Sequence, residues 1–239
     1  MSYLSRGISF NKLHSYEDMN LTLVKIEIET PNKKKIFEEI PFSNEQFDFS
    51  EVFGSQCYEN RKIICTFNTL EQIEIEYVET LRVKAINWLM KNGRRDILRV
   101  DQVPGYYFSG EVIDGINPEL VENQIYELTV TFDCYPFKIS NEAEGNDIWD
   151  IFNFELDIAQ TIDYEIKGQQ KIVLYNNGAN NVSPMITATS NFEITMDNTI
   201  YSIKQGVTED DDFKFKQGEV HLLVKGNGNI NFKFYKEML

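Results

Sequence analysis

The residue types that carry most acid–base and metal chemistry are scarce in this chain. Its 239 residues include two histidines, His14 and His221, and three cysteines, Cys57, Cys65 and Cys134. The histidines lie far apart in the sequence, and no Cys-x-x-Cys pair occurs. A zinc site, a disulfide framework and a nucleophilic triad therefore have no visible basis. The cysteines are expected to be half-buried free thiols, as in a protein assembled in a reducing cytoplasm.

Long apolar runs and phosphate-binding loops are missing as well. The longest apolar runs span only a few residues, so no membrane helix is expected, and Gly7–Asn11 interrupts any secretory signal at the start. No glycine-rich phosphate loop appears, and Gly226–Gly228 is interpreted as the turn of a hairpin. The acidic run Glu209–Asp212 lacks the spacing of a calcium loop and is interpreted as a solvated loop. We therefore predict no cofactor and no metal.

Basic residues are in the minority. The chain has 23 Lys and Arg against 38 Asp and Glu, a formal net charge of −15. Tight wrapping of nucleic acid requires clustered basic side chains, so this balance argues against it, and equally against an anionic membrane surface. It does not argue against a surface that nucleic acid passes without adhering.

The hydrophobic fraction of 42% is ordinary for a folded soluble protein, and the length allows one large domain or two modest ones. Period-two alternation predicts strands at residues 21–29, 61–67, 110–113 and 127–134. One apolar stripe with helical spacing predicts a helix over residues 77–91, capped by Gly93 and sealed on a sheet by Trp88.

A polar, acidic stretch at residues 140–146 is predicted as a linker between domains at 1–139 and 147–239. Beyond it, strand signals recur with turn signals between them and no helix-length gap. This pattern predicts an antiparallel β-sandwich. The expected strands are residues 170–175, 184–189, 192–196, 199–203, 213–216, 219–224 and 230–235.

Aromatic residues are plentiful, with 12 Tyr and 17 Phe. Clustered aromatic rings stack on sugars, but they also fill β-sheet cores and subunit interfaces. For a saccharide site, the residues to test are Trp149, Tyr175 and Tyr201.

The order of features in residues 1–139 resembles the distal tail proteins of siphophages, the long-tailed phages, and of prophages of Gram-positive bacteria. Gly7–Ser15 resembles the opening I-x-F-(N/G)-x-x-H-S of that family. Phe49–Ser55 followed by Cys57–Ile63 resembles its glycine and (Y/F)-x-(N/D)-R-x-I. After a helix with a Trp, Asp101–Gly110 resembles its D-x-x-P-(G)-x-Y turn, and Glu127–Lys138 its closing strand. Five pieces in this order make the resemblance fairly specific.

The second part matches less sharply. Asn176–Thr187 resembles the family's entry into a galectin-like sandwich, and Leu222–Ile230 resembles its late G-x-G-x-I hairpin. One departure is the segment 93–101, which is more basic here than the family pattern leads us to expect.

The resemblance implies a mainly β fold with two parts. The first would form a hexameric ring between the tail tube and the tail-tip or baseplate proteins, with one helix packed on its sheet. The second would be a galectin-like antiparallel sandwich outside the ring. The most patterned positions are candidates for the ring interface or its turns: Asn60, Arg61, Pro104, Gly105, Tyr106 and Tyr107. Asn60 and Arg61 would make either an inter-subunit ion pair or a local turn and strand start, and Pro104–Gly105 predicts a type II turn.

The leading hypothesis is therefore a structural, non-enzymatic protein of the virion tail tip. It would be assembled in the host cytoplasm without a signal peptide and would let DNA pass through a ring without binding it specifically. The alternative is a binding module whose sandwich recognises host cell-wall saccharide or another baseplate protein. An enzyme is the third hypothesis, and the sequence lacks a constellation to support it.

Overall fold

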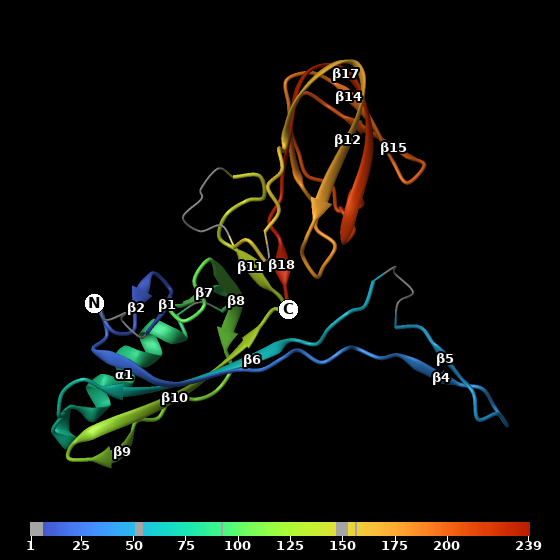
Figure 1. The fold of residues 1–239 in the computed structure, drawn as a ribbon. Helices are drawn as coiled ribbons and strands as arrows, with labels where there is room; N and C mark the ends of the chain where they lie inside the picture. Colours follow the sequence, from blue (N-terminus) through green and yellow to red (C-terminus); the bar gives the residue numbers. More distant parts are fainter. Residues whose placement is uncertain (1–6, 51–54, 92, 147–152, 156) are drawn as a thin grey trace. The chain divides into compact units, whose positions relative to one another are not determined.

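The computed structural model describes residues 7–50, 55–91, 93–146, 153–155 and 157–239 (Figure 1). The chain divides into two compact units, Met1–Lys138 with Leu239, and Ile139–Met238. Both units consist mainly of antiparallel strands, which confirms the predicted fold class.

The first unit is built on one antiparallel sheet with strand order β2-β1-β7-β8-β10-β6-β3, and β9 is also paired with β10. Its strands are β1 (Ile8–Phe10), β2 (Leu13–His14), β3 (Leu21–Ile28), β6 (Arg61–Thr69), β7 (Asp96–Val100), β8 (Tyr106–Val112), β9 (Glu119–Glu122) and β10 (Ile125–Cys134). The long pairing of β6 with β10 lies between β3 on one side and β8 and β9 on the other. Alternate residues of β6, from Ile63 to Phe67, are fully buried, as the period-two pattern predicts.

A short 3₁₀ turn, η1 (Ile75–Tyr77), leads into helix α1 (Val78–Leu89). Trp88 on α1 donates a hydrogen bond from Nε1 to the Phe10 carbonyl (2.8 Å), and its ring meets Phe67 edge-on. The predicted role of Trp88 as a packing residue is therefore confirmed. The predicted cap was wrong: the Met90 amide closes the last turn on Ile86, so the helix is capped at Met90 and not at Gly93.

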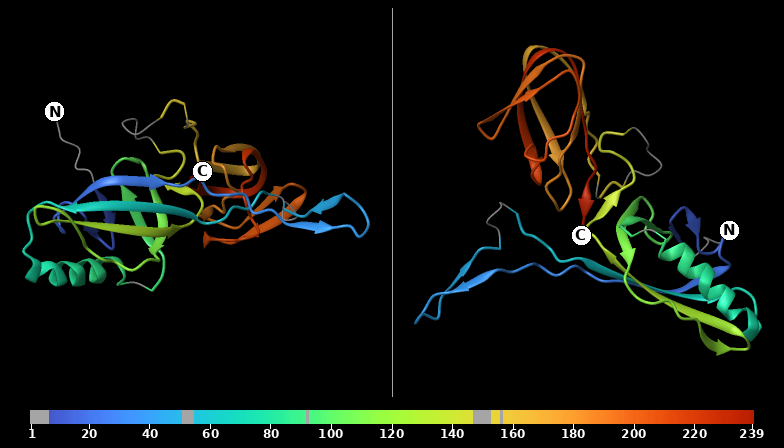
Figure 2. Two further views of the ribbon diagram at one scale, coloured as in Figure 1. Left: turned by 90° about the horizontal axis from the view of Figure 1, so that it is seen from below. Right: turned by 180° about the vertical axis from the view of Figure 1, so that it is seen from behind.

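A two-stranded ribbon leaves this sheet between β3 and β6 (Figures 1 and 2). Backbone hydrogen bonds continue the pairing from Glu59 to Asn32 (2.8 Å) and from Lys34 to Cys57 (2.9 Å). The ribbon ends in strands β4 (Phe37–Glu39) and β5 (Gln46–Asp48), which pair only with each other among the described strands. We call residues 36–49 the arm.

The second unit is organised around one long strand, β17 (Gly218–Lys233). β12 (Asp163–Asn176) pairs with it on one side, and β14 (Phe192–Met196) and β13 (Met185–Ala188) pair with different halves of its other side. β15 (Thr199–Ile203) follows β14, and β16 (Gly206–Thr208) follows β13. Both branches contribute side chains to one core, as in a sandwich.

Two strand predictions in this unit were wrong. Gly226–Gly228 is not a hairpin turn, because β17 runs through it and stays paired with β12. The two glycines have φ of +148° and +134°, which lets the strand bend without losing its partner. A Cβ on Gly226 would lie 2.4 Å from the Phe192 ring. Residues 213–216 form no strand either, since Phe215 makes only an isolated bridge to Val182.

The predicted linker, residues 140–146, lies inside the second unit. It follows strand β11 (Lys138–Ser140), which pairs with β18 (Glu237–Met238). The Ser140 amide donates to the Lys236 carbonyl (3.0 Å), and the Glu144 amide donates to the Phe234 carbonyl (2.9 Å). Ser140 and Glu144 are therefore hydrogen-bonded to the backbone between β17 and β18.

Candidate functional site

Asn60, one of the predicted interface residues, is held within the first unit. Its side-chain amide donates to Asp133 Oδ2 (2.7 Å), and Arg95 donates to the same oxygen (2.9 Å). Asp133 thus ties the start of β6 to the segment that precedes β7. The two donors on one carboxylate make this a local, partly buried contact within the first unit.

Arg61 points into the first unit. It is 5% exposed, its Nε donates to the Pro136 carbonyl (2.7 Å), and its guanidinium lies 5.5 Å from the centre of the Phe108 ring. Burial lowers the pKa of Arg61. Within the described residues its Nη2 has no hydrogen-bond partner, so the ring of Phe108 supplies part of the stabilisation that a carboxylate would give.

The Pro104–Gly105 turn leads directly into β8. Gly105 has φ of +82°, the value that the third position of a type II turn requires. Tyr106 and Tyr107 follow on opposite faces of the strand, and each lies under a cation: Lys138 Nζ is 5.4 Å from the Tyr106 ring, and the Arg99 guanidinium is 5.9 Å from the Tyr107 ring. The motif residues thus form two neighbouring clusters on β6 and β8 of the first unit.

Tyr175, a predicted saccharide contact, lies on the outward face of β12 in the second unit. Its hydroxyl donates to Glu219 Oε1 (2.8 Å), and this hydrogen bond raises the pKa of Tyr175. His221 Nε2 lies 3.2 Å from the other oxygen of Glu219. Val173, two residues before Tyr175, is 43% exposed on the same face.

Tyr201 does not lie on the outward face that carries Tyr175. It pairs in register with the buried Ile194, and its ring meets the buried Phe213 edge-on at 4.8 Å. Because residues paired across strands share a face, Tyr201 lies on the core side of the sheet. Trp149, the third candidate, lies outside the described residues.

The other histidine, His14, also lies beside a carboxylate, with its Nε2 3.4 Å from Asp101. Its Nδ1 accepts the backbone N–H groups of Tyr16 and Glu17 (3.3 Å each), so both ring nitrogens are engaged. Asp101 also accepts the Gly7 amide (2.8 Å), and a Cβ on Gly7 would lie 2.5 Å from the His14 ring. The glycine and histidine of the opening motif therefore pack together and anchor the start of β1. Neither ring nitrogen of His14 is left without a partner, so neither is free to act as a base.

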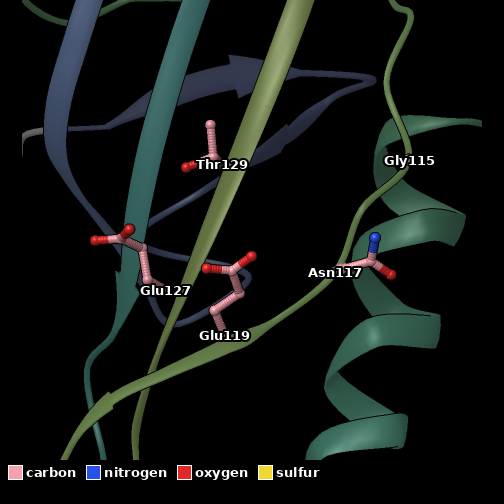
Figure 3. Close-up of a pocket in the computed structure, with 5 residues that line it drawn as sticks. All are labelled: Gly115, Asn117, Glu119, Glu127 and Thr129. Atoms are coloured by element: carbon pink, nitrogen blue, oxygen red, sulfur yellow. The ribbon is translucent and has the colours of Figure 1, made fainter.

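A small pocket of about 130 Å³ lies beside β9 and β10 in the first unit (Figure 3). Its lining residues are Gly115, Asn117, Glu119, Glu127 and Thr129. Glu119 and Glu127 stand directly opposite each other across the strand pair, where like charges repel. Within the described residues no group of three or more His, Cys, Asp or Glu side chains is placed to hold a metal ion.

The cysteines are all free thiols. Burial raises the pKa of Cys65 and of Cys134 to about 12, so neither forms a thiolate near neutral pH. Cys57 is exposed at the base of the arm.

Sequence reasoning missed the arm. It carries five large apolar side chains that are exposed to solvent: Ile36 (55%), Phe37 (51%), Phe42 (fully exposed), Phe47 (59%) and Phe49 (43%). None of them belongs to the hydrophobic core of the first unit. The period-two spacing of Phe47 and Phe49 was the available signal, but it does not reveal that a strand pair lacks a covering layer.

None of the helices in the described part of the chain has both the length and the apolar character needed to cross a membrane.

The fold is similar to that of a solved phage hub protein. The SPP1 Dit protein (gp 19.1), described as a paradigm of the hub adsorption apparatus in phages that infect Gram-positive bacteria, aligns with a TM-score of 0.66 at 10% identity. The alignment covers 98% of this chain and 99% of that one. Chains of the phage p2 baseplate in its activated conformation align with TM-scores of 0.43 (with Sr, 11% identity, 94% and 92% covered) and 0.37 (with Ca, 10% identity, 90% and 91% covered). No protein-family model and no curated protein matches the sequence.

Proposed function

We propose that this protein is a structural component of a siphophage tail tip, where six copies form a ring that joins the tail tube to the baseplate proteins. The likeness to the SPP1 hub protein over nearly the whole of both chains supports this proposal. So does the scarcity of groups for catalysis: both ring nitrogens of His14 are engaged, and His221 lies exposed beside Glu219. The proposed role is one of assembly.

The exposed apolar arm is the observation that most supports a ring. A closed ring needs a heterologous contact, in which one surface of each subunit meets a different surface of the next. Burying a large apolar side chain contributes about 1.5–3 kcal/mol, so the arm's five side chains would supply a substantial part of a subunit contact. An extended ribbon that leaves its own sheet is well suited to lie along a neighbouring subunit.

The charge of the chain is compatible with DNA passing through the ring. Six copies, at −15 each, would carry a formal net charge of −90. A lumen lined by part of this charge would repel DNA rather than adsorb it.

The test is the mass of the purified protein by light scattering over a range of concentrations, followed by negative-stain imaging. Six copies of the 27.9 kDa chain give about 167 kDa, and we expect an open ring. Replacing Phe37 and Phe47 on the arm by Ser should abolish the ring without unfolding the first unit. The matched control replaces Leu120 and Val121, which are 62% and 56% exposed on β9, by Ser. A ring that survives loss of the arm's phenylalanines would contradict the proposed contact.

Recognition of host saccharide by the second unit is a second proposal. It is supported by the outward row of Tyr175, Glu219 and His221, which places an aromatic ring beside polar groups. A glycan array should give signals that Tyr175→Ala removes and that Val207→Ala, at an exposed position on β16, does not. A silent array would count against this role.

A further inference from the structure

Strand β12 is a long edge. All fourteen of its residues pair with β17, and no other strand in the described residues pairs with it. β17, in contrast, is covered on both sides, because β14 and β13 occupy its other flank. An edge of this length presents a row of backbone donors and acceptors that natural sheets usually cover or protect.

The outward direction of these groups is established at Tyr175. Its amide donates to Gln160 Oε1 (2.9 Å), and its carbonyl accepts from Gln160 Nε2 (2.8 Å). Both backbone groups therefore point away from β17, and Tyr175 and Glu219 form a pair without hydrogen bonds between the strands. The primary amide of Gln160 occupies the place that a peptide group of an added strand would take.

Antiparallel pairing alternates, so every second residue before Tyr175 has the same orientation. The amides and carbonyls of Val173, Lys171 and Gln169 consequently face the open side of β12. The register with β17 is continuous over these positions. Gly168, with φ of +78°, marks the end of this regular stretch. The free edge is therefore residues 169–173.

The side chains along this edge determine which kind of strand could pair with it. Lys171 is exposed and makes no ion pair within the described part of the chain, whereas Lys167 is 2.9 Å from Glu165. A lysine on an edge disfavours pairing with basic strands or a second lysine-bearing edge, and it favours a carboxylate. Val173 is 43% exposed on the same face as Lys171 and offers an apolar contact two residues away.

We propose that residues 169–173 of β12 accept an extended acidic segment of another protein by strand addition. Backbone hydrogen bonds would hold the segment, a carboxylate opposite Lys171 would select it, and an aliphatic side chain would pack on Val173. Gln160 would form the boundary of the site, since it already occupies the position at Tyr175. This assignment concerns the second unit and does not depend on ring formation.

The experiment is a titration of the ¹⁵N-labelled full-length chain with two blocked pentapeptides, one alternating Glu and Val and the other alternating Lys and Val. We expect the Glu peptide to shift the amides of Gln169, Lys171 and Val173, and to bind at least tenfold more tightly than the Lys peptide. Lys171→Glu should reverse this preference. The matched control, Lys214→Glu, makes the same charge change at an exposed position outside residues 169–173 and should leave the preference unchanged.

Val173→Pro removes one outward amide that β17 does not use, so the sandwich should stay folded while peptide binding falls at least fivefold. Shifts at β15 or β16 instead of β12, or an unchanged preference in Lys171→Glu, would overturn the proposal. Absence of shifts with either peptide at millimolar concentration would also overturn it. Concentration-dependent shifts of the β12 amides without peptide would assign the edge to a second copy of the chain. The ring is judged separately, by mass.

Discussion

Gly110 on β8 gives the sharpest test of how the first unit is packed. It lies directly opposite Cys134 on β10. A Cβ built on Gly110 would be 2.4 Å from Cys134 Sγ and 3.3 Å from the Asp133 carbonyl oxygen. Non-bonded heavy atoms need about 3.5–4.0 Å, so Gly110→Ala forces the fully buried sulfur or the strand to move. Overpacking of this kind costs about 1–3 kcal/mol of unfolding free energy.

The same geometry predicts a rescue. Cys134→Ala alone removes the sulfur and leaves a void, at a cost of about 1–2 kcal/mol. In the double variant the alanine methyl at position 110 enters the space that Sγ vacates. The double variant should therefore be less destabilised than the sum of the two single variants, by about 1–3 kcal/mol.

The assay is urea denaturation of the wild type, both single variants and the double variant. Fluorescence of Trp88 in a Trp149→Phe background reports on the first unit, because Trp88 is buried in its core. Gly93→Ala is the control, since nothing lies within 4 Å of a Cβ placed there. Effects of Gly110→Ala and Cys134→Ala that add within about 0.5 kcal/mol would refute the reasoning, because the two side chains would then not share the space.

Two further predictions concern buried polar groups. Trp88→Phe should destabilise the first unit by about 1–3 kcal/mol, because the buried Phe10 carbonyl loses its donor. Urea denaturation followed by far-UV circular dichroism measures this, and an unchanged midpoint would contradict it. In the second unit burial raises the pKa of Glu144, although Lys236 and Gln160 act against this shift. The protonated carboxyl is thus favoured in the folded state, and its contribution, present below the unfolded pKa of about 4.3, is lost as the pH rises through the folded value. Glu144→Gln should therefore become more stable relative to the wild type between pH 4 and pH 7, as measured by denaturation at each pH; a constant difference would contradict this.

Local alternation was sufficient to predict much of the fold. Residues 192–196 and 199–203 form β14 and β15 with the predicted bounds, and the strands at 21–29 and 127–134 differ from β3 and β10 by at most two residues at either end. These segments have one buried and one exposed face, so apolar and polar residues alternate along them with period two. The helix was predicted for the corresponding reason, because its apolar stripe faces the sheet.

The parts that sequence reasoning missed depend on distant residues. Gly226 and Gly228 have the composition of a turn, but the partner strand β12 and the close approach of Phe192 keep them inside β17. Phe215 alternates with Phe213 like a strand residue, yet both side chains are buried in the sandwich core from a segment with one isolated bridge. In each case a tertiary contact overrides the local pattern.

The arm and the β12 edge share a property that bears on assembly. The two hydrophobic cores are complete without them: the arm's side chains belong to neither core, and the outward amides of residues 169–173 face away from β17. Folding therefore does not account for five exposed apolar side chains or for an open row of hydrogen-bonding groups. A net charge of −15 keeps such chains apart unless a contact is specific. An apolar ribbon on one unit and a lysine-marked edge on the other would then give a subunit two different contacts, one for copies of itself and one for an acidic partner.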